Sequence, residues 1–234
     1  MNGIIPEARQ KVKYKAVIFD LDGTLIDTLD DIAESMNAVL RRHNFSVHPV
    51  LHYKDLVGWG IRNLVERTLP ESAKNDEIIT ICTNEMLAEY SAHPVVKSRP
   101  YPDIPRLLSD LEKRAIPYAV FSNKTDSLTQ VIVKAVLGDF NFKIVMGSLA
   151  EKPKKPDPTC AVEIARDLGY KPDQVLFLGD SSVDMDTARA AGMFPAGALW
   201  GFRTAGELTR HGAKALLNNP MELLDYLENN RVIS

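Results

Sequence analysis

The chain has 234 residues, of which 25% are charged and 45% are hydrophobic, and its net charge at pH 7 is -3. This composition is that of an ordinary globular protein, and the charge gives no indication of nucleic acid or an acidic membrane as a partner. Two cysteines, Cys82 and Cys160, cannot form a disulfide framework. Residues 1–13 lack the apolar stretch of a signal peptide, and no apolar run approaches the roughly 18 residues of a membrane helix. We therefore expect a cytoplasmic protein with reduced thiols.

Short apolar runs separated by helical patterns determine the expected fold. Runs rich in Val, Ile, Leu and Phe predict strands buried on both faces at 15–19, 118–121, 143–146, 174–178 and 196–200. Helical patterns lie between them at 104–111, 160–168 and 184–191, and a last helix begins at Asn219-Pro220. Strand and helix in alternation predict an α/β fold with a doubly wound parallel sheet.

Residues 28–92 interrupt this alternation, because they show helical patterns and no convincing strand. A helix with an acidic first turn begins at Thr28, and the apolar spacing predicts further helices near 64–69 and over 78–90. A helical block between the first and second strands is interpreted as an insert that covers the site. We expect an α/β core at 1–27 and 93–234 and a small all-helical cap at 28–92.

Residues able to carry chemistry follow the predicted strands. They are Asp20, Asp22, Gly23 and Thr24 after the first strand, Ser122 and Asn123 after the second, Lys152 and Lys155 after the third, and Asp180 and Asp184 after the fourth. The carboxyl ends of parallel strands meet at one edge of a doubly wound sheet, where ligands bind. Four carboxylates, a hydroxyl group and at least one lysine are therefore expected to converge there.

Such a cluster of carboxylates requires a cation. Two carboxylates about 4 Å apart repel each other by roughly 4 kcal/mol at an effective dielectric constant near 20. Mg²⁺ prefers oxygen ligands and combines one or two carboxylates with substrate phosphate. A carboxylate can attack phosphorus, and a second carboxylate can transfer the proton of the leaving group. The pattern therefore predicts Mg²⁺-dependent phosphoryl transfer.

Four motifs in this order resemble those of the haloacid dehalogenase-like superfamily. They are Asp20-Leu-Asp22-Gly23-Thr24-Leu25, Ser122-Asn123-Lys124, Lys155-Pro-Asp-Pro and Gly179-Asp180-Ser-Ser-Val-Asp184. The resemblance extends over nearly the whole chain after the first dozen residues, and it implies a Rossmann-like core.

The resemblance also implies roles for these residues. Asp20 would be the nucleophile and Asp22 the acid/base. The metal ligands would be Asp20, Asp22 through its main-chain carbonyl, Asp180 and Asp184, the last directly or through water. Ser122 and Lys155 would hold the phosphoryl group, and Gly23, Thr24 and Asn123 belong to the same phosphate- and substrate-binding motifs.

The second aspartate of the first motif is typical of the superfamily's phosphatases and not of its dehalogenases. Within the superfamily the chain is most similar to the phosphoglycolate phosphatases. The segment Val57-Gly-Trp59-Gly-Ile-Arg62 resembles the cap loop of that group, except that Trp59 adds bulk at the tip of the loop. Arg62 is a candidate to bind a substrate carboxylate, because arginine can grip one bidentately. The function expected is hydrolysis of a small phosphomonoester, with 2-phosphoglycolate as the best guess, by a monomer or homodimer without nucleic-acid or membrane partners.

Structural interpretations of the same residues remain open. Asp180 could be the N-cap of a tight turn, Ser122-Asn123 could be only an N-cap, and the lysines at 152–155 could be a solvated run. Lys155 is preferred to Lys152 because it precedes Pro-Asp-Pro and a helix.

Other functions also remain open. A sugar phosphomutase would need a second phosphate site, for which Arg41, Arg42, Arg62 and Arg67 are available in the predicted cap. A phosphonate hydrolase would need a Schiff-base lysine, which Lys54 or Lys74 would have to supply. A phosphatase or pyrophosphatase of the same superfamily with another substrate range, and a binding module built on an inactive phosphatase, are the remaining alternatives.

Overall fold

The computed structural model describes residues 14–227, so the expectations for residues 1–13 and the last seven residues of the predicted core lie outside it. A six-stranded sheet with the order β5-β4-β1-β6-β7-β8 forms the centre, and every pair of neighbours is parallel. Its strands are β1 (Ala16–Phe19), β4 (Tyr118–Thr125), β5 (Ile144–Ser148), β6 (Val175–Gly179), β7 (Phe194–Ala198) and β8 (Ala215–Leu217). The predicted parallel sheet is confirmed.

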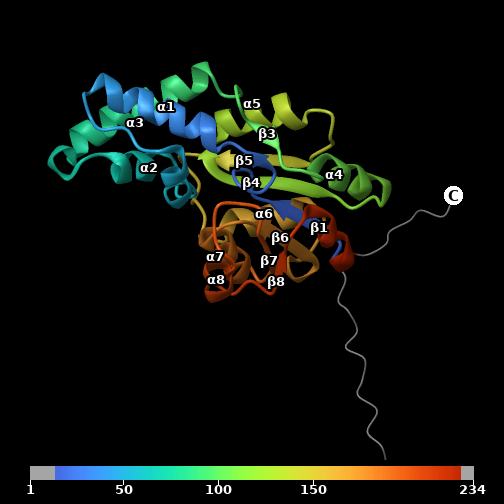
Figure 1. Cartoon of the computed structure of the whole chain (residues 1–234). Coiled ribbons are helices and arrows are strands. Elements are labelled where there is room, and N and C mark those ends of the chain that lie inside the picture. Colours follow the sequence, from blue (N-terminus) through green and yellow to red (C-terminus); the bar gives the residue numbers. More distant parts are fainter. Residues whose placement is uncertain (1–13, 228–234) are drawn as a thin grey trace, which may run out of the picture.

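Helices cover both faces of this sheet (Figure 1). They are α4 (Ile104–Lys113), α5 (Asp126–Leu137), α6 (Thr159–Asp167), α7 (Ser182–Ala190) and α8 (Ala205–Arg210), with the short 3-10 turns η3 (Pro172–Gln174) and η4 (Pro220–Tyr226). All four residues of β1 are fully buried, because Val17 and Phe19 face one hydrophobic cluster and Ala16 and Ile18 face the other. This double burial explains why the strand is a continuous apolar run.

A block of helices gathers at one end of the molecule (Figure 1). It contains α1 (Leu29–Arg42), η1 (Val50–Asp55), α2 (Ile61–Thr68), η2 (Glu71–Ala73) and α3 (Asp76–Ala92). Within residues 28–92, all of which the structure describes, there are helices and no strand, as the pattern predicted. The apolar faces of these helices continue the hydrophobic cluster of the sheet.

Two short connections join the helical block to the sheet. They are β2 (Ile26–Asp27) and β3 (Arg99–Pro100), which pair antiparallel. Beside them the buried carboxylate of Asp31 accepts hydrogen bonds from the backbone N–H groups of Val96, Lys97 and Ser98 and from the Ser98 hydroxyl. Burial raises the pKa of Asp31, but these hydrogen bonds outweigh it, so the net shift is downward. Asp31 thus fastens the start of α1 to the segment that leaves the block.

Several elements differ from the sequence prediction. β7 begins at Phe194 and ends at Ala198, two residues before the predicted bounds, because its ladder with β6 starts where Phe194 pairs with Leu176. β2, β3 and β8 were not predicted. The last helix is a 3-10 helix, and Asn219 caps it by accepting from the N–H of Met221, as predicted.

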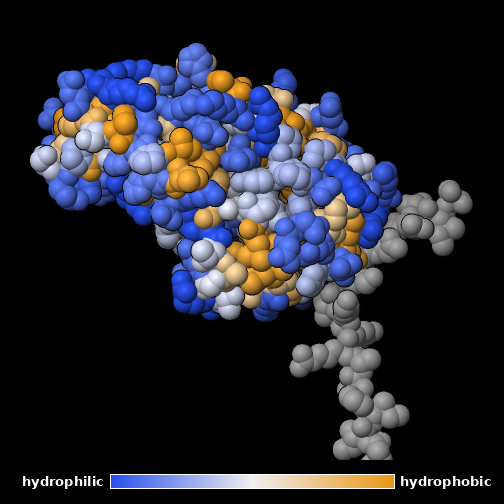
Figure 2. Space-filling view, viewed as in Figure 1, coloured by the Kyte–Doolittle hydropathy of each residue, from blue (hydrophilic) through white to orange (hydrophobic). Residues whose placement is uncertain are grey.

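The described residues contain no helix long and apolar enough to cross a membrane. The surface in Figure 2 is largely hydrophilic with small hydrophobic patches, some of which lie over the helical block. The exposed large hydrophobic side chains include Val47, Leu51 and Trp59, and they are spread along the sequence. Scattered exposed apolar residues of this kind are normal for a globular protein.

Candidate active site

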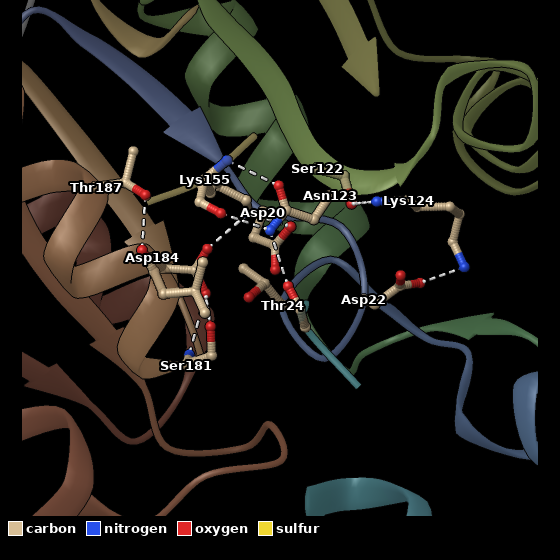
Figure 3. Close-up of polar contacts among 12 residues, drawn as sticks. Asp20, Asp22, Thr24, Ser122, Asn123, Lys124, Lys155, Ser181, Asp184 and Thr187 are labelled. Atoms are coloured by element: carbon tan, nitrogen blue, oxygen red, sulfur yellow. Dashed lines mark hydrogen bonds and ion pairs between the residues drawn. The ribbon is translucent and has the colours of Figure 1, made fainter. Parts of the chain in front are cut away.

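Asp20 lies immediately after β1, at the carboxyl edge of the sheet, where its backbone N–H donates to the carbonyl of Leu178 at the end of β6. Its side chain is only 9% exposed, and Oδ1 is 2.8 Å from Nζ of Lys155 (Figure 3). The hydrogen bond to β6 therefore fixes the backbone of Asp20, and Lys155 contacts its carboxylate. Asp20 is the centre around which the other polar groups gather.

Asp180 and Asp184 are brought to Asp20 by β6 and α7. Each of the three buried carboxylates offers one oxygen, and these oxygens lie within 4.8 Å of one another. Asp180 accepts hydrogen bonds from the backbone N–H of Phe202 and from the Thr24 hydroxyl. Hard oxygen ligands at this spacing fit Mg²⁺, which Asp20, Asp180 and Asp184 could hold together.

Asp184 is held by the start of α7. The N-cap of this helix is Ser181 and not Asp180, and Oδ2 of Asp184 accepts from both the N–H and the hydroxyl of Ser181. Its other oxygen, Oδ1, is 2.7 Å from Nζ of Lys155. The capping box therefore fixes the orientation of Asp184 toward the cluster.

Backbone glycines let the chain approach Asp180 closely. Gly23 has φ +81°, and a Cβ at this position or at Gly201 would overlap the side chain of Asp180. Gly23 and Thr24, which the motif predicted as phosphate- and substrate-binding residues, both lie against Asp180. Their observed contacts position this carboxylate.

Lys155 reaches the cluster from the loop after β5. Asn123 holds that loop, because its amide accepts from the N–H of Lys155 at 2.9 Å and donates to the carbonyls of Lys155 and Gly58, each at 3.0 Å. The Lys155 ammonium lies between Asp20 and Asp184, whereas Lys152 pairs with Glu163. Of the two lysines considered from sequence, the structure thus brings Lys155 to the carboxylates.

Charge and burial shift the ionisation of the cluster. Burial, followed by the charge of Asp184, raises the pKa of Asp20 to about 7, although Lys155 opposes the shift. Burial, followed by the charges of Asp184 and Asp20, raises the pKa of Asp180 well above its ordinary value. Burial would lower the pKa of Lys155, but Asp184 and Asp20 reverse the effect and raise it. The carboxylates therefore carry negative charge at a high cost unless a cation offsets it.

Asp22 lies apart from this cluster and faces Lys124 (Figure 3). Its Oδ1 accepts from the Thr28 hydroxyl at 2.6 Å and lies 3.0 Å from Nζ of Lys124. Thr28 therefore binds Asp22 instead of capping α1. Nζ of Lys124 also donates to the hydroxyl of Tyr90 on α3, at 3.0 Å.

A pocket opens between the sheet edge and the helical block. Its polar floor is formed by Asp20, Asp22, Ser122, Asn123 and Lys124. Residues of the helical block form the opposite wall. Gly58, Gly60 and Tyr90 belong to it, and the rest of this wall consists of apolar side chains: Ile32, Val57, Ile61, Leu64 and Met86. Ser122 is buried and its Oγ accepts from the N–H of Lys124, so it does not cap a helix. The arrangement places an apolar surface opposite a row of reactive groups.

Arg62 is not brought to this pocket. Its guanidinium bonds the side chains of Asp76 and Thr80 at the start of α3 and is about half exposed. Trp59, at the tip of the loop between Gly58 and Gly60, is 43% exposed and does not line the pocket.

Sequence reasoning assigned no role to three residues that connect the floor of the site with the helical block. The ammonium of Lys124 donates a hydrogen bond to the hydroxyl of Tyr90. Arg203, in the loop after β7, donates to the carbonyls of Val57 and Asp55. Lys124 is the last residue of the second motif, Ser122-Asn123-Lys124, and this position was its sequence signal. Tyr90 and Arg203 reach the other half of the site through contacts with residues 34 and 146 positions away, so neither carried a sequence signal.

Comparisons with known proteins agree with this geometry. A model of the haloacid dehalogenase-like hydrolase family matches residues 17–198. The chain is similar to the phosphoglycolate phosphatase of Aquifex aeolicus, with 29% identity over 93% of this chain and 99% of that protein. It is also similar to the N-acetylmuramic acid 6-phosphate phosphatase of Pseudomonas aeruginosa, with 30% identity over 94% of this chain and 97% of that protein. A crystal structure of a predicted phosphoglycolate phosphatase from Haemophilus somnus superposes with a TM-score of 0.84 at 25% identity, covering 91% of this chain and 97% of that one.

Proposed function

Because the chain belongs to the haloacid dehalogenase-like hydrolase family, we propose that it is a Mg²⁺-dependent phosphatase that acts through a phosphoryl group on Asp20. Membership of the family agrees with the four motifs, and the curated relatives described above are phosphatases, which makes this chain a phosphatase of the same family. The observation that supports the chemistry best is the buried group of Asp20, Asp180 and Asp184 with the ammonium of Lys155 beside it.

The proposed reaction has two steps. The carboxylate of Asp20 attacks phosphorus, a bond forms between Oδ and phosphorus, and the ester P–O bond breaks as Asp22 gives a proton to the leaving oxygen. Asp22 then takes a proton from water, which attacks the phosphorus and releases phosphate from Asp20. A Mg²⁺ ion held by Asp20, Asp180 and Asp184, with the carbonyl of Asp22, would neutralise charge on the phosphoryl oxygens.

Other residues hold the phosphoryl group during these steps. Lys155 can donate to the phosphoryl oxygens because its ammonium already lies 2.8 Å from Asp20. Ser122 supplies a hydroxyl from within β4, while Asn123 keeps the Lys155 loop against that strand. Asp184 orients the ammonium from the other side.

The helical block of residues 28–92 would serve as the cap of this site. Asn123 donates to the carbonyl of Gly58, and Arg203 donates to that of Val57, so two residues of the core hold the loop before α2 over the pocket. A cap in this position excludes water and contacts the leaving group. Its apolar wall contributes to the choice of substrate.

A small phosphate monoester is the proposed substrate, and 2-phosphoglycolate is the best candidate. One of the two relatives named above acts on phosphoglycolate and the other on N-acetylmuramic acid 6-phosphate, so both compounds belong in the assay. We place the protein in the cytoplasm, as a monomer or homodimer, a location that its two free, buried cysteines suit.

The contacts of the described residues do not favour the rival reactions. Neither Lys54 nor Lys74 lines the pocket, so a Schiff-base lysine is not positioned there for phosphonate hydrolysis. Among the arginines considered for a second phosphate, Arg42 pairs with Glu85 and Glu89, and Arg67 donates to a backbone carbonyl.

Release of inorganic phosphate from a panel of small phosphomonoesters, with Mg²⁺ or with chelator, tests the proposal. We expect release only with Mg²⁺, with 2-phosphoglycolate among the best substrates. Mg²⁺-dependent release from other esters but not from 2-phosphoglycolate would support the proposed reaction and reject 2-phosphoglycolate as the substrate. Absence of release from every compound would reject the proposed function.

A further inference from the structure

Lys124 joins the two halves of the pocket. It lies in β4 directly after Ser122 and Asn123, and its side chain is only 4% exposed. The ammonium contacts Asp22 on the floor of the site and the hydroxyl of Tyr90 in the helical block, and it lies 4.5 Å from the centre of the Tyr90 ring. The charge is therefore placed where the leaving group of a substrate would pass.

Protein acceptors account for two of the three hydrogens of this ammonium. A lysine ammonium has three donors, and the described partners of Nζ are Asp22 and Tyr90. A buried cation with a donor left over in a pocket can accept an anionic ligand with little rearrangement, because the cost of burying the charge has already been met by the fold.

Lys124 is the nearest cation to Asp22 among the side chains that line the described pocket, while the ammonium of Lys154 lies at the rim beside Gly60. Among the residues that line the described pocket, Lys124 is the single positively charged side chain. The cap side presents apolar groups such as Ile61, Leu64 and Met86, and Arg62 is turned to Asp76.

The position of Lys124 restricts where the anion can be. Its ammonium lies 3.0 Å from Asp22, the residue proposed above to protonate the ester oxygen. An anion that pairs with Lys124 must therefore be close to that oxygen in the substrate, as the carboxylate of a 2-hydroxy acid is. A carboxylate several carbons away would meet the apolar wall instead.

We propose that Lys124, held by Asp22 and Tyr90, is the residue that selects a leaving group with a carboxylate next to the ester oxygen. This assignment rests on the proposed phosphatase function and adds to it the residue that recognises the leaving group.

The test compares Lys124→Met with the wild-type protein on two esters, 2-phosphoglycolate and 2-hydroxyethyl phosphate, with saturating Mg²⁺. A charge-assisted hydrogen bond to a ligand contributes roughly 10- to 100-fold in affinity. We expect kcat/KM for 2-phosphoglycolate to fall by about this factor through KM, with a much smaller loss for the uncharged leaving group. Lys152→Met, which removes an ammonium paired with Glu163 outside the pocket, should leave both esters unchanged.

The outcomes separate this inference from the proposed function. Equal losses on the two esters would show that Lys124 acts only through Asp22 or the fold and would overturn the carboxylate subsite, as would a wild-type protein without preference for the acid. If circular dichroism shows that Lys124→Met does not fold, Lys124→Gln removes the charge but keeps a hydrogen-bond donor, and the same selective rise in KM is expected. A wild-type protein that releases phosphate from neither ester nor any other would instead reject the phosphatase itself.

Discussion

Replacing Asp20 by asparagine should abolish turnover and, at the same time, stabilise the metal-free protein. Asp20 is buried among Asp180 and Asp184, and its pKa is raised from an ordinary value of 3.8 to about 7. A carboxyl whose pKa is higher in the folded state binds its proton more tightly there than in the unfolded chain. Its contribution to stability is therefore complete below pH 4 and is lost as the pH rises toward 7.

The pKa shift gives the size of this effect. About three pKa units at 1.36 kcal/mol each correspond to a cost on the order of 4 kcal/mol at pH 8. Asparagine never ionises, so Asp20→Asn avoids this cost. The gain in the free energy of unfolding should be about 4 kcal/mol at pH 8 and less than about 2 kcal/mol at pH 5. Mg²⁺ should reduce the difference at pH 8, because the ion favours the ionised carboxylate of the wild-type protein.

Urea denaturation followed by circular dichroism, at pH 5 and pH 8 and with chelator or Mg²⁺, measures this difference. Asp139→Asn provides a matched control, because it makes the same substitution at an exposed aspartate outside the site and should change stability little. If Asp20→Asn is no more stable than the wild-type protein at pH 8 with chelator, the reasoning that the negative charge of the cluster destabilises the metal-free protein is refuted.

Further predictions concern neighbouring parts of the structure. Lys155→Met leaves two buried carboxylates without their cation, so urea denaturation should show a free energy of unfolding lower by about 3–5 kcal/mol. The side chain of Lys152 is partly exposed, and Lys152→Met should cost under about 1 kcal/mol. Equal losses in the two variants would contradict the buried pairing. Gly201→Ala overlaps an aspartate of the proposed metal site and should weaken Mg²⁺ binding in calorimetric titration, while Gly206→Ala, with its nearest neighbour 3.5 Å away, should not. Asp31→Asn should lower the melting temperature at pH 7 and make it fall less steeply in acid. The reason is that the pKa of this carboxyl is lowered in the folded state, so its contribution to stability is lost as the pH falls below about 4. A melting temperature that falls in acid as it does for the wild-type protein would rule out this contribution.

The long buried strands could be predicted from the sequence, whereas the short ones could not. β1 and β6 are buried on both faces, so their apolar runs coincide with the strands. β2 and β3 have two residues each and β8 has three, which is too short to show a period. These strands form because the surrounding fold brings their partners within hydrogen-bonding distance.

The same limit applies to the site. Asp20 and Asp180 follow apolar strands, and the shared edge of a parallel sheet is enough to predict that they meet. Lys124 belongs to the second motif, but the motif gave it no role, because its contact with Tyr90 joins residues 34 positions apart. Arg62 shows the opposite case, because its sequence context indicated the pocket while the fold turns it to Asp76.

Transfer of the phosphoryl group to Asp20 is the central claim, and trapping that group tests it most directly. The wild-type protein is mixed with 2-phosphoglycolate and Mg²⁺, quenched in acid during turnover, digested and examined by mass spectrometry, in parallel with Asp20→Asn and with a sample containing chelator. The expected result is a phosphoryl group on the peptide that contains Asp20, in the wild-type protein with Mg²⁺ and in neither control. Phosphate release that continues in Asp20→Asn, or a phosphoryl group on another residue while Asp20 stays unmodified, would contradict the proposed mechanism.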